Sequence, residues 1–290
     1  MSVRAKAELL LVLICVVWGA SFVVVKGALA DASPLVFLAI RFTIAGIVSA
    51  LVLRARPLEL SRQALGAGAT LGLFLLGGYI LQVNGLLYTT PSKSAFITAF
   101  SVVLVPIILA LGGAPLRLAN IVAAAAGVAG LYVLLAPSRL SDVNRGDLLT
   151  LAGSISFGYY IVRVGRYAER FHFRDLVPVQ ILVVGLGAAL LLPFDRHPRL
   201  HWTPGFAAAI AITALLSTAL AFSVQNWAQR YTPPAHTALI LSLEPVFTAV
   251  ASRWITGERM GGRIVAGSAM MLAGVLVSEL WGGRPAPIES

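Results

Sequence analysis

Two ionisable side chains interrupt long apolar stretches of the sequence, and their positions limit the chemistry that they can perform. Glu244 lies in the middle of one stretch and Arg41 about a third of the way along another. A charge within a membrane span costs about 2.5–3.5 kcal/mol on insertion scales, so such groups tend to face a cavity, a partner or a pathway. A carboxylate placed there could bind a proton, an amine or a hydroxyl, and a guanidinium could bind an anion.

Each of these charges also has a structural interpretation. Glu244 precedes Pro245, which removes a backbone donor and disfavours helical geometry at the preceding residue. The carboxylate could therefore serve a binding site at a helix bend, or it could hydrogen-bond to a neighbouring helix or pair with a buried cation. Arg41 could bind a substrate carboxylate, or it could extend toward the headgroups or fix an adjacent loop.

Amide and aromatic side chains extend the candidate site. Gln82 and Gln225 occupy equivalent places when the second half of the chain is aligned with the first at an offset of 143 residues. Aromatic residues lie three positions before each amide, so each pair shares one helix face. An aromatic cavity with amides and one carboxylate suits a flat amphipathic solute. The predicted substrate-binding residues are Trp18, Tyr79, Gln82, Phe157, Tyr160, Phe222, Gln225 and Glu244, with Arg41 as a candidate anion contact; packing or lipid-facing positions are the alternative for the aromatics.

The composition shows which elements must position these residues. The 290 residues are 58% hydrophobic and 12% charged, with a mean hydropathy of +0.88, which is more apolar surface than one soluble core can bury. The net charge of +10 comes from Lys and Arg near span ends, where we expect them to contact lipid headgroups. We expect no nucleic-acid partner. The expected spans are 8–30, 34–53, 65–87, 92–112, 118–137, 147–167, 175–193, 204–229, 234–255 and 261–281.

Residues 8–137 and 147–281 repeat the same succession of apolar segments. An offset of 139 matches Trp18-Gly19 with Phe157-Gly158, and an offset of 143 matches Pro91 with Pro234. Because each half holds five spans, the two halves must cross the membrane in opposite directions, which is typical of inverted-repeat transporters. The sequence therefore predicts an all-α membrane protein of ten transmembrane helices, in which repeats 1–137 and 138–290 surround a central cavity.

Each half of the sequence carries its own set of short motifs. They are Trp18-Gly19-Ala20-Ser21-Phe22, Arg41-Phe42 and Ser94-Ala95-Phe96-Ile97-Thr98 in the first half, and Tyr231-Thr232, Ser242-Leu243-Glu244-Pro245 and Gly257-Glu258-Arg259 in the second. Over essentially its whole length the chain resembles EamA-type transporters of the drug/metabolite transporter superfamily. The resemblance implies ten helices around a central cavity and transport of small metabolites, often export of amino acids, including aromatic ones.

A secondary transporter is therefore the expected function, working by alternating access with a small-molecule substrate and without a metal or organic cofactor. The sequence contains no GxxxxGK[ST] motif, so nucleotide hydrolysis by this chain cannot drive it. A facilitative uniporter or channel-like permease is the alternative. An intramembrane enzyme fits less well, because it needs a clustered nucleophile and base or paired carboxylates. The oligomeric state stays open.

Charge placement also predicts the orientation. Lys and Arg concentrate in the 54–62 and 163–174 connections, which places both termini in the cytoplasm, in what we expect to be a bacterial inner membrane. The first apolar run is too long for a cleaved signal core and has a counterpart in the second half, so we expect a membrane span there. Lys93 and His236 begin equivalent spans, and we expect them to be interfacial anchors rather than pathway residues.

Overall fold

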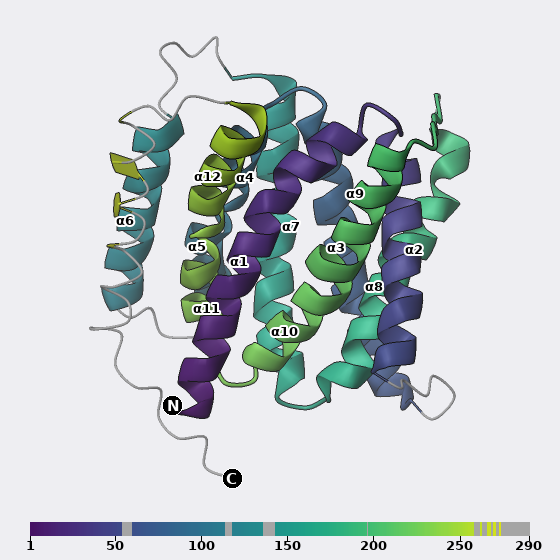
Figure 1. The fold of residues 1–290 in the computed structure, drawn as a ribbon. Coiled ribbons are helices and arrows are strands. Elements are labelled where there is room, and N and C mark those ends of the chain that lie inside the picture. The colour runs from purple at the N-terminus through teal and green to yellow at the C-terminus, as the bar shows by residue number, and fades with distance from the viewer. Residues whose placement is uncertain are drawn as a thin grey trace.

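The computed structural model describes residues 1–53, 60–113, 118–135, 143–195 and 197–257, together with a few isolated positions beyond them. Within these residues the chain is helical, and it contains no sheet. The α-helices of Figure 1 are α1 (Val3–Ala28), α2 (Pro34–Val52), α3 (Arg62–Leu86), α4 (Pro91–Thr98), α5 (Ser101–Leu111), α6 (Leu118–Leu135), α7 (Arg145–Ala168), α8 (Phe173–Leu190), α9 (Pro204–Ala214), α10 (Ala221–Ala228), α11 (Pro234–Leu241) and α12 (Glu244–Thr256).

Eight helical segments of the described chain are long and apolar enough to cross a membrane. They are Val3–Ala28, Pro34–Val52, Arg62–Leu86, Pro91–Leu111, Arg145–Ala168, Phe173–Phe194, Pro204–Ala228 and Pro234–Thr256. Eight of the ten spans expected from sequence thus have a matching segment. The fifth expected span coincides with α6 over 118–135. The tenth, 261–281, lies largely outside the described residues, as do Glu258 and Arg259.

Side chains are distributed as expected for a protein surrounded by lipid. The outer face of α1 exposes Leu9, Leu13 and Val16, whereas small polar residues such as Ser94 and Thr150 are fully buried. In a soluble protein this outer face of α1 would carry mostly polar side chains, because water hydrates exposed polar groups. Together with the eight segments that are long and apolar enough to cross a membrane, these exposed apolar side chains identify the described bundle as the membrane-embedded part of an integral membrane protein.

Three of the spans are not continuous α-helices. The fourth segment is interrupted between α4 and α5, and the last one between α11 and α12, directly before Glu244. Pro245 explains the second interruption, since it lacks the backbone N–H that would donate to the carbonyl four residues earlier. The segment that joins α9 to α10, Leu215–Leu220, is π-helical. Such segments leave backbone carbonyls available for other partners, and they are frequent at functional sites.

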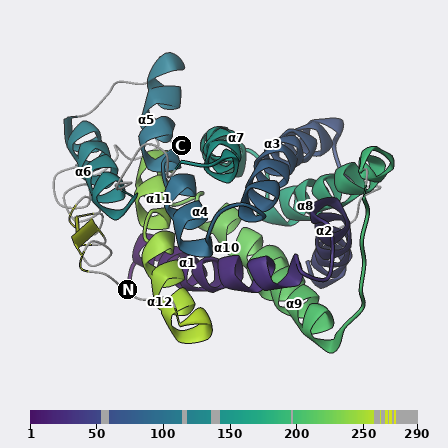
Figure 2. The same ribbon diagram turned by 90° about the horizontal axis from the view of Figure 1, so that it is seen from above.

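The helices pack as two walls that draw on both halves of the sequence. We call α1, α10 and α12 the α1 wall, and α3 and α7 the α7 wall. Figure 2 shows α1 crossing the bundle beside α12, while α7 and α3 lie on the other side. Gly19 lets α1 approach α12 closely, because a Cβ there would lie 2.8 Å from the Phe247 Cβ. Gly72 of α3 does the same against α8, where a Cβ would lie 2.6 Å from the Val183 Cβ.

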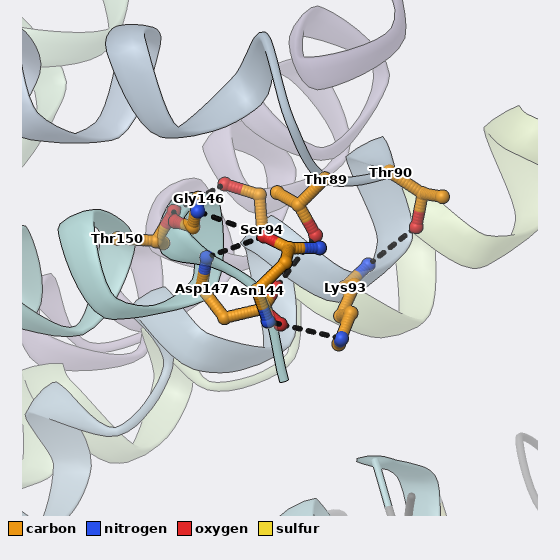
Figure 3. Close-up of polar contacts among 8 residues, drawn as sticks. All are labelled: Thr89, Thr90, Lys93, Ser94, Asn144, Gly146, Asp147 and Thr150. Carbon is orange, nitrogen blue, oxygen red and sulfur yellow. Dashed lines mark hydrogen bonds and ion pairs between the residues drawn. The ribbon is translucent and has the colours of Figure 1, made fainter. Parts of the chain in front are cut away.

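A polar cluster fastens the start of α7 to the start of α4 (Figure 3). Asp147 accepts hydrogen bonds from the Lys93 Nζ at 2.5 Å and the Thr89 Oγ1 at 2.7 Å. It also closes a capping box with Asn144, whose backbone N donates to the Asp147 Oδ2 at 2.9 Å. One buried carboxylate therefore joins the α3–α4 turn, α4 and α7 at a single point.

A second acid–base pair lies at the opposite end of the bundle, beside the N-terminus. The His236 Nε2 of α11 lies 3.4 Å from the Glu8 Oε1 of α1. At the sequence offsets of 143 and 139, His236 corresponds to Lys93, and Asp147 to Glu8. Lys93 and His236 are absent from the residues that line the cavity described below, and each holds two helices together at a bundle end.

We predict that Asp147→Ala lowers the free energy of unfolding by about 2–4 kcal/mol, because it leaves Lys93 without its carboxylate and removes a helix cap. Thermal unfolding of the purified protein in detergent measures this as a lowered Tm. Glu169→Ala, which removes an exposed acid at the other end of α7, is the matched control and should change the Tm little. Equal Tm values for the two variants would show that the cluster does not stabilise the fold.

Candidate functional site

A cavity opens between the α1 wall and the α7 wall, with an empty volume of about 740 Å³ that includes open solvent. The interruptions between α4 and α5 and between α11 and α12 border it. Most of its lining is apolar or aromatic, with a few polar groups among them. The lining residues are Trp18, Ser21, Phe22, Val25, Arg41, Leu75, Tyr79, Gln82, Val83, Leu86, Thr98, Ala99, Ser101, Phe157, Tyr160, Ile161, Phe222, Gln225, Leu241 and Glu244.

The cavity brings together every site residue that the sequence singled out. These are the aromatic residues Trp18, Tyr79, Phe157, Tyr160 and Phe222, the amides Gln82 and Gln225, and the ionisable residues Arg41 and Glu244. They come from α1, α2, α3, α7, α10 and α12, so residues far apart in the chain meet at one place. Their part in binding a substrate stays a prediction.

The aromatic side chains form one connected cluster. The Phe222 ring centroid lies 5.5 Å from that of Trp18, 5.9 Å from that of Tyr160 and 6.3 Å from that of Tyr79. The Tyr79 ring also packs edge-on against Phe157 at 5.3 Å. Such contacts hold flat rings at fixed angles, and each is worth about 0.5–1.5 kcal/mol beyond the area that it buries. The cavity therefore has rigid aromatic surfaces.

The π-helical segment Leu215–Leu220 supplies partners for two of the cavity side chains. The Trp18 Nε1 donates to the Ser217 backbone O at 2.7 Å. The Arg41 Nε donates to the Thr218 Oγ1 at 2.9 Å, and the guanidinium lies over the Phe42 and Tyr79 rings at 5.0 and 5.3 Å. Arg41 is thus buried in the bundle and does not extend to the headgroups. Its surroundings hold the guanidinium in place at the cavity wall.

The two amides are held differently. The Gln82 Nε2 donates to the Thr98 Oγ1 at 2.9 Å, and that hydroxyl donates in turn to the Ser94 O. The Gln225 Oε1 is buried and has no hydrogen-bond partner within the described part of the chain. A buried polar atom without a partner costs about 1–3 kcal/mol. Gln225 therefore presents an unused acceptor beside the cavity.

Glu244 is the first residue of α12 and lines the cavity where α11 ends. A carboxylate at the N-terminus of a helix is favoured by the helix dipole and by backbone N–H groups that lack partners in the first turn. The interruption expected from Pro245 therefore places the carboxylate at a helix start that faces the cavity. A titratable group there can exchange a proton or a cation with whatever occupies the cavity.

Some lining residues were missed by sequence reasoning. Thr98 fixes Gln82, and Ser101 begins α5 just as Glu244 begins α12. Ser101 lies 143 residues before Glu244, so the same offset that paired the two glutamines would have found it. Thr98 carried no such signal. The described residues hold no group of three or more His, Cys, Asp or Glu side chains that could bind a metal.

The described residues form a helical membrane bundle with a cavity, and comparison with known proteins identifies the family. The sequence profile of the EamA-like transporter family matches residues 5–136 and 144–280. The chain belongs to this family.

The similar proteins are transporters as well. An uncharacterized transporter of Archaeoglobus fulgidus is 30% identical over 96% of this chain and 87% of its own length. The uncharacterized inner membrane transporter YedA of Escherichia coli is 26% identical over 90% of this chain and 85% of its own length. A solved crystal structure with 20% identity superposes with a TM-score of 0.77 and covers 96% of this chain and 97% of its own, which shows a shared fold.

Proposed function

We propose that this protein is a secondary transporter that moves small amphipathic metabolites by alternating access, with amino acids, aromatic ones included, as the substrate class and export as the direction. The observation that carries the proposal is that aromatic surfaces, two amides, a carboxylate and a guanidinium meet in one cavity. The proposal includes ten helices in two inverted repeats, both termini in the cytoplasm and an inner-membrane location.

The chemistry of the cavity suits both ends of an amino acid. Glu244 can bind an ammonium group, and Arg41, whose Nε donates to Thr218, can bind a carboxylate through its terminal guanidinium nitrogens. The unpartnered Gln225 Oε1 can accept a further hydrogen bond from the solute. The Trp18, Tyr79 and Phe222 rings offer flat apolar surface for the remainder of such a molecule.

A fixed site near the middle of the membrane that is reached from one side at a time would produce transport without a resident cofactor. Glu244 gives such a site a means of coupling solute transport to protons, because a carboxyl that faces the cavity can be protonated in one part of the transport cycle and charged in another. A channel-like permease would conduct without saturation. Flux measurements in proteoliposomes with a panel of amino acids and other small solutes therefore separate the two functions.

We predict that Gln225→Leu raises the apparent KM for transport about threefold to tenfold, because leucine keeps the bulk of the side chain and removes one hydrogen bond to the solute. Gln82→Leu should have a similar effect. Initial rates of counterflow in proteoliposomes give the KM. Gln63→Leu, at the exposed start of α3, is the control. If both cavity variants transport with the KM and rate of the control, the substrate does not contact the amides.

We predict that Glu244→Gln inserts into the membrane normally but loses about 10- to 100-fold in transport rate, because the amide keeps size and hydrogen bonding and loses charge and titration. Uptake by proteoliposomes, with and without an imposed pH gradient, measures this. Glu169→Gln, which alters an exposed acid outside the cavity, is the control.

The same assay separates two roles for Glu244. If native transport follows the pH gradient and the variant retains only exchange that ignores the gradient, the carboxyl carries the coupling proton. If net flux and exchange both vanish at every pH, it contacts the substrate. Rates equal to those of the native protein would leave Glu244 as a helix-packing residue beside Pro245.

A further inference from the structure

One side chain spans the edge of the cavity from one wall to the other. Lys26 lies near the end of α1, directly after the cavity-lining Val25. Its Nζ donates to the backbone O of Leu86, and also to those of Leu87 at 3.3 Å and Thr89 at 3.2 Å. Leu86 lines the cavity and is the last residue of α3. The ammonium thus joins the α1 wall to the α7 wall where their lining residues come to an end.

The nature of this contact allows it to form and break. The carbonyls at a helix C-terminus lack partners within the helix, and the helix dipole favours a cation beside them. Lys26 is only half-buried, and its partners belong to the end of α3 and the turn after it. When the contact breaks, the ammonium and the carbonyls can both be hydrated at the membrane surface. Neither is left as a buried polar group without a partner.

The other end of the cavity is joined in a different way. The Gln229 Nε2 that follows α10 donates to the Ile161 O of α7 at 2.9 Å, which again connects the α1 wall to the α7 wall. This bond is neutral and buried. The two acid–base pairs serve another purpose, because Lys93–Asp147 connects α4 to α7 and Glu8–His236 connects α1 to α11. Neither of these pairs crosses from the α1 wall to the α7 wall.

We propose that Lys26 is a gate residue, whose ammonium closes the cavity at its own end by binding the C-terminal carbonyls of α3 and releases them when that end opens. The gate rests on the proposed function, since it regulates access to the same cavity. Because each wall contains helices from both halves of the sequence, the bodies that move apart at Lys26 are the walls and not the two halves. The N-terminal end would open across the neutral Gln229 contact instead.

Accessibility of a cysteine in the cavity tests the gate. Cys15, the single cysteine of the chain, is replaced by alanine, and Ser21, which lines the cavity, is replaced by cysteine. A membrane-impermeant maleimide is applied from the side opposite the N-terminus. Lys26→Met keeps the length of the side chain and removes its charge, so it should raise the labelling rate about tenfold by weakening the closed state. Lys26→Arg, which can still donate to the carbonyls, should restore a rate close to that of the unmodified background.

Lys6→Met is the matched control, since it removes an exposed lysine near the other end of the same helix. If Lys26→Met fails to reach the membrane, Lys26→Gln, which keeps a donor and loses the charge, should raise the labelling rate by a smaller factor. A labelling rate equal to that of Lys6→Met in a correctly inserted Lys26 variant would overturn the gate.

Counterflow measured on the same vesicles separates the gate from the proposed function. Without any saturable flux in the native protein, the proposed transport fails even if labelling responds to Lys26. With normal flux in the native protein and labelling that ignores Lys26, the gate alone fails.

Discussion

The need to satisfy backbone hydrogen bonds without water governs this structure. In a bilayer a helix satisfies its own N–H and C=O groups, so departures from helical geometry occur only where protein or a cavity supplies other partners. Here the α4–α5 interruption, the α11–α12 interruption and the π-helical segment all lie at or beside the cavity. The Ser217 O of the π-helical segment accepts from Trp18, which shows how a displaced carbonyl finds a partner. The irregular backbone segments and the polar cavity thus have a common cause, which is that backbone groups without helical partners must find other partners inside the protein.

Close helix contact keeps the rest of the bundle rigid around these irregular segments. Gly19 and Gly72 let the backbones of neighbouring helices approach at distances that any side chain would prevent. In a bilayer, apolar side chains gain little free energy when they leave the lipid for a contact between helices. Close packing and buried polar contacts therefore provide much of the association between helices. Polar contacts also join helices at the bundle ends, where Asp147 and Glu8 each connect helices from different halves of the sequence.

Much of the fold and of the candidate site could be predicted from sequence, because the membrane imposes strong rules. Apolar runs predicted eight spans that the structure matches. The cost of charged groups in lipid pointed to Arg41 and Glu244, and the equivalent places of the two amides in the halves pointed to Gln82 and Gln225; all four residues line the cavity. The α4–α5 interruption was missed, since no proline lies there. The Arg41–Thr218 contact was also missed, because helical periodicity cannot reveal a π-helical segment.

The most direct test is whether a transported solute occupies the cavity. Ala99 lines it at the α4–α5 interruption, so Ala99→Cys in a Cys15→Ala background places one reactive thiol there. With a solute that the protein transports, we predict that a bulky maleimide abolishes flux and that the solute slows labelling in proportion to its saturation of transport. Labelling that leaves flux intact, or that the solute does not slow, would contradict the assignment of this cavity as the transport site.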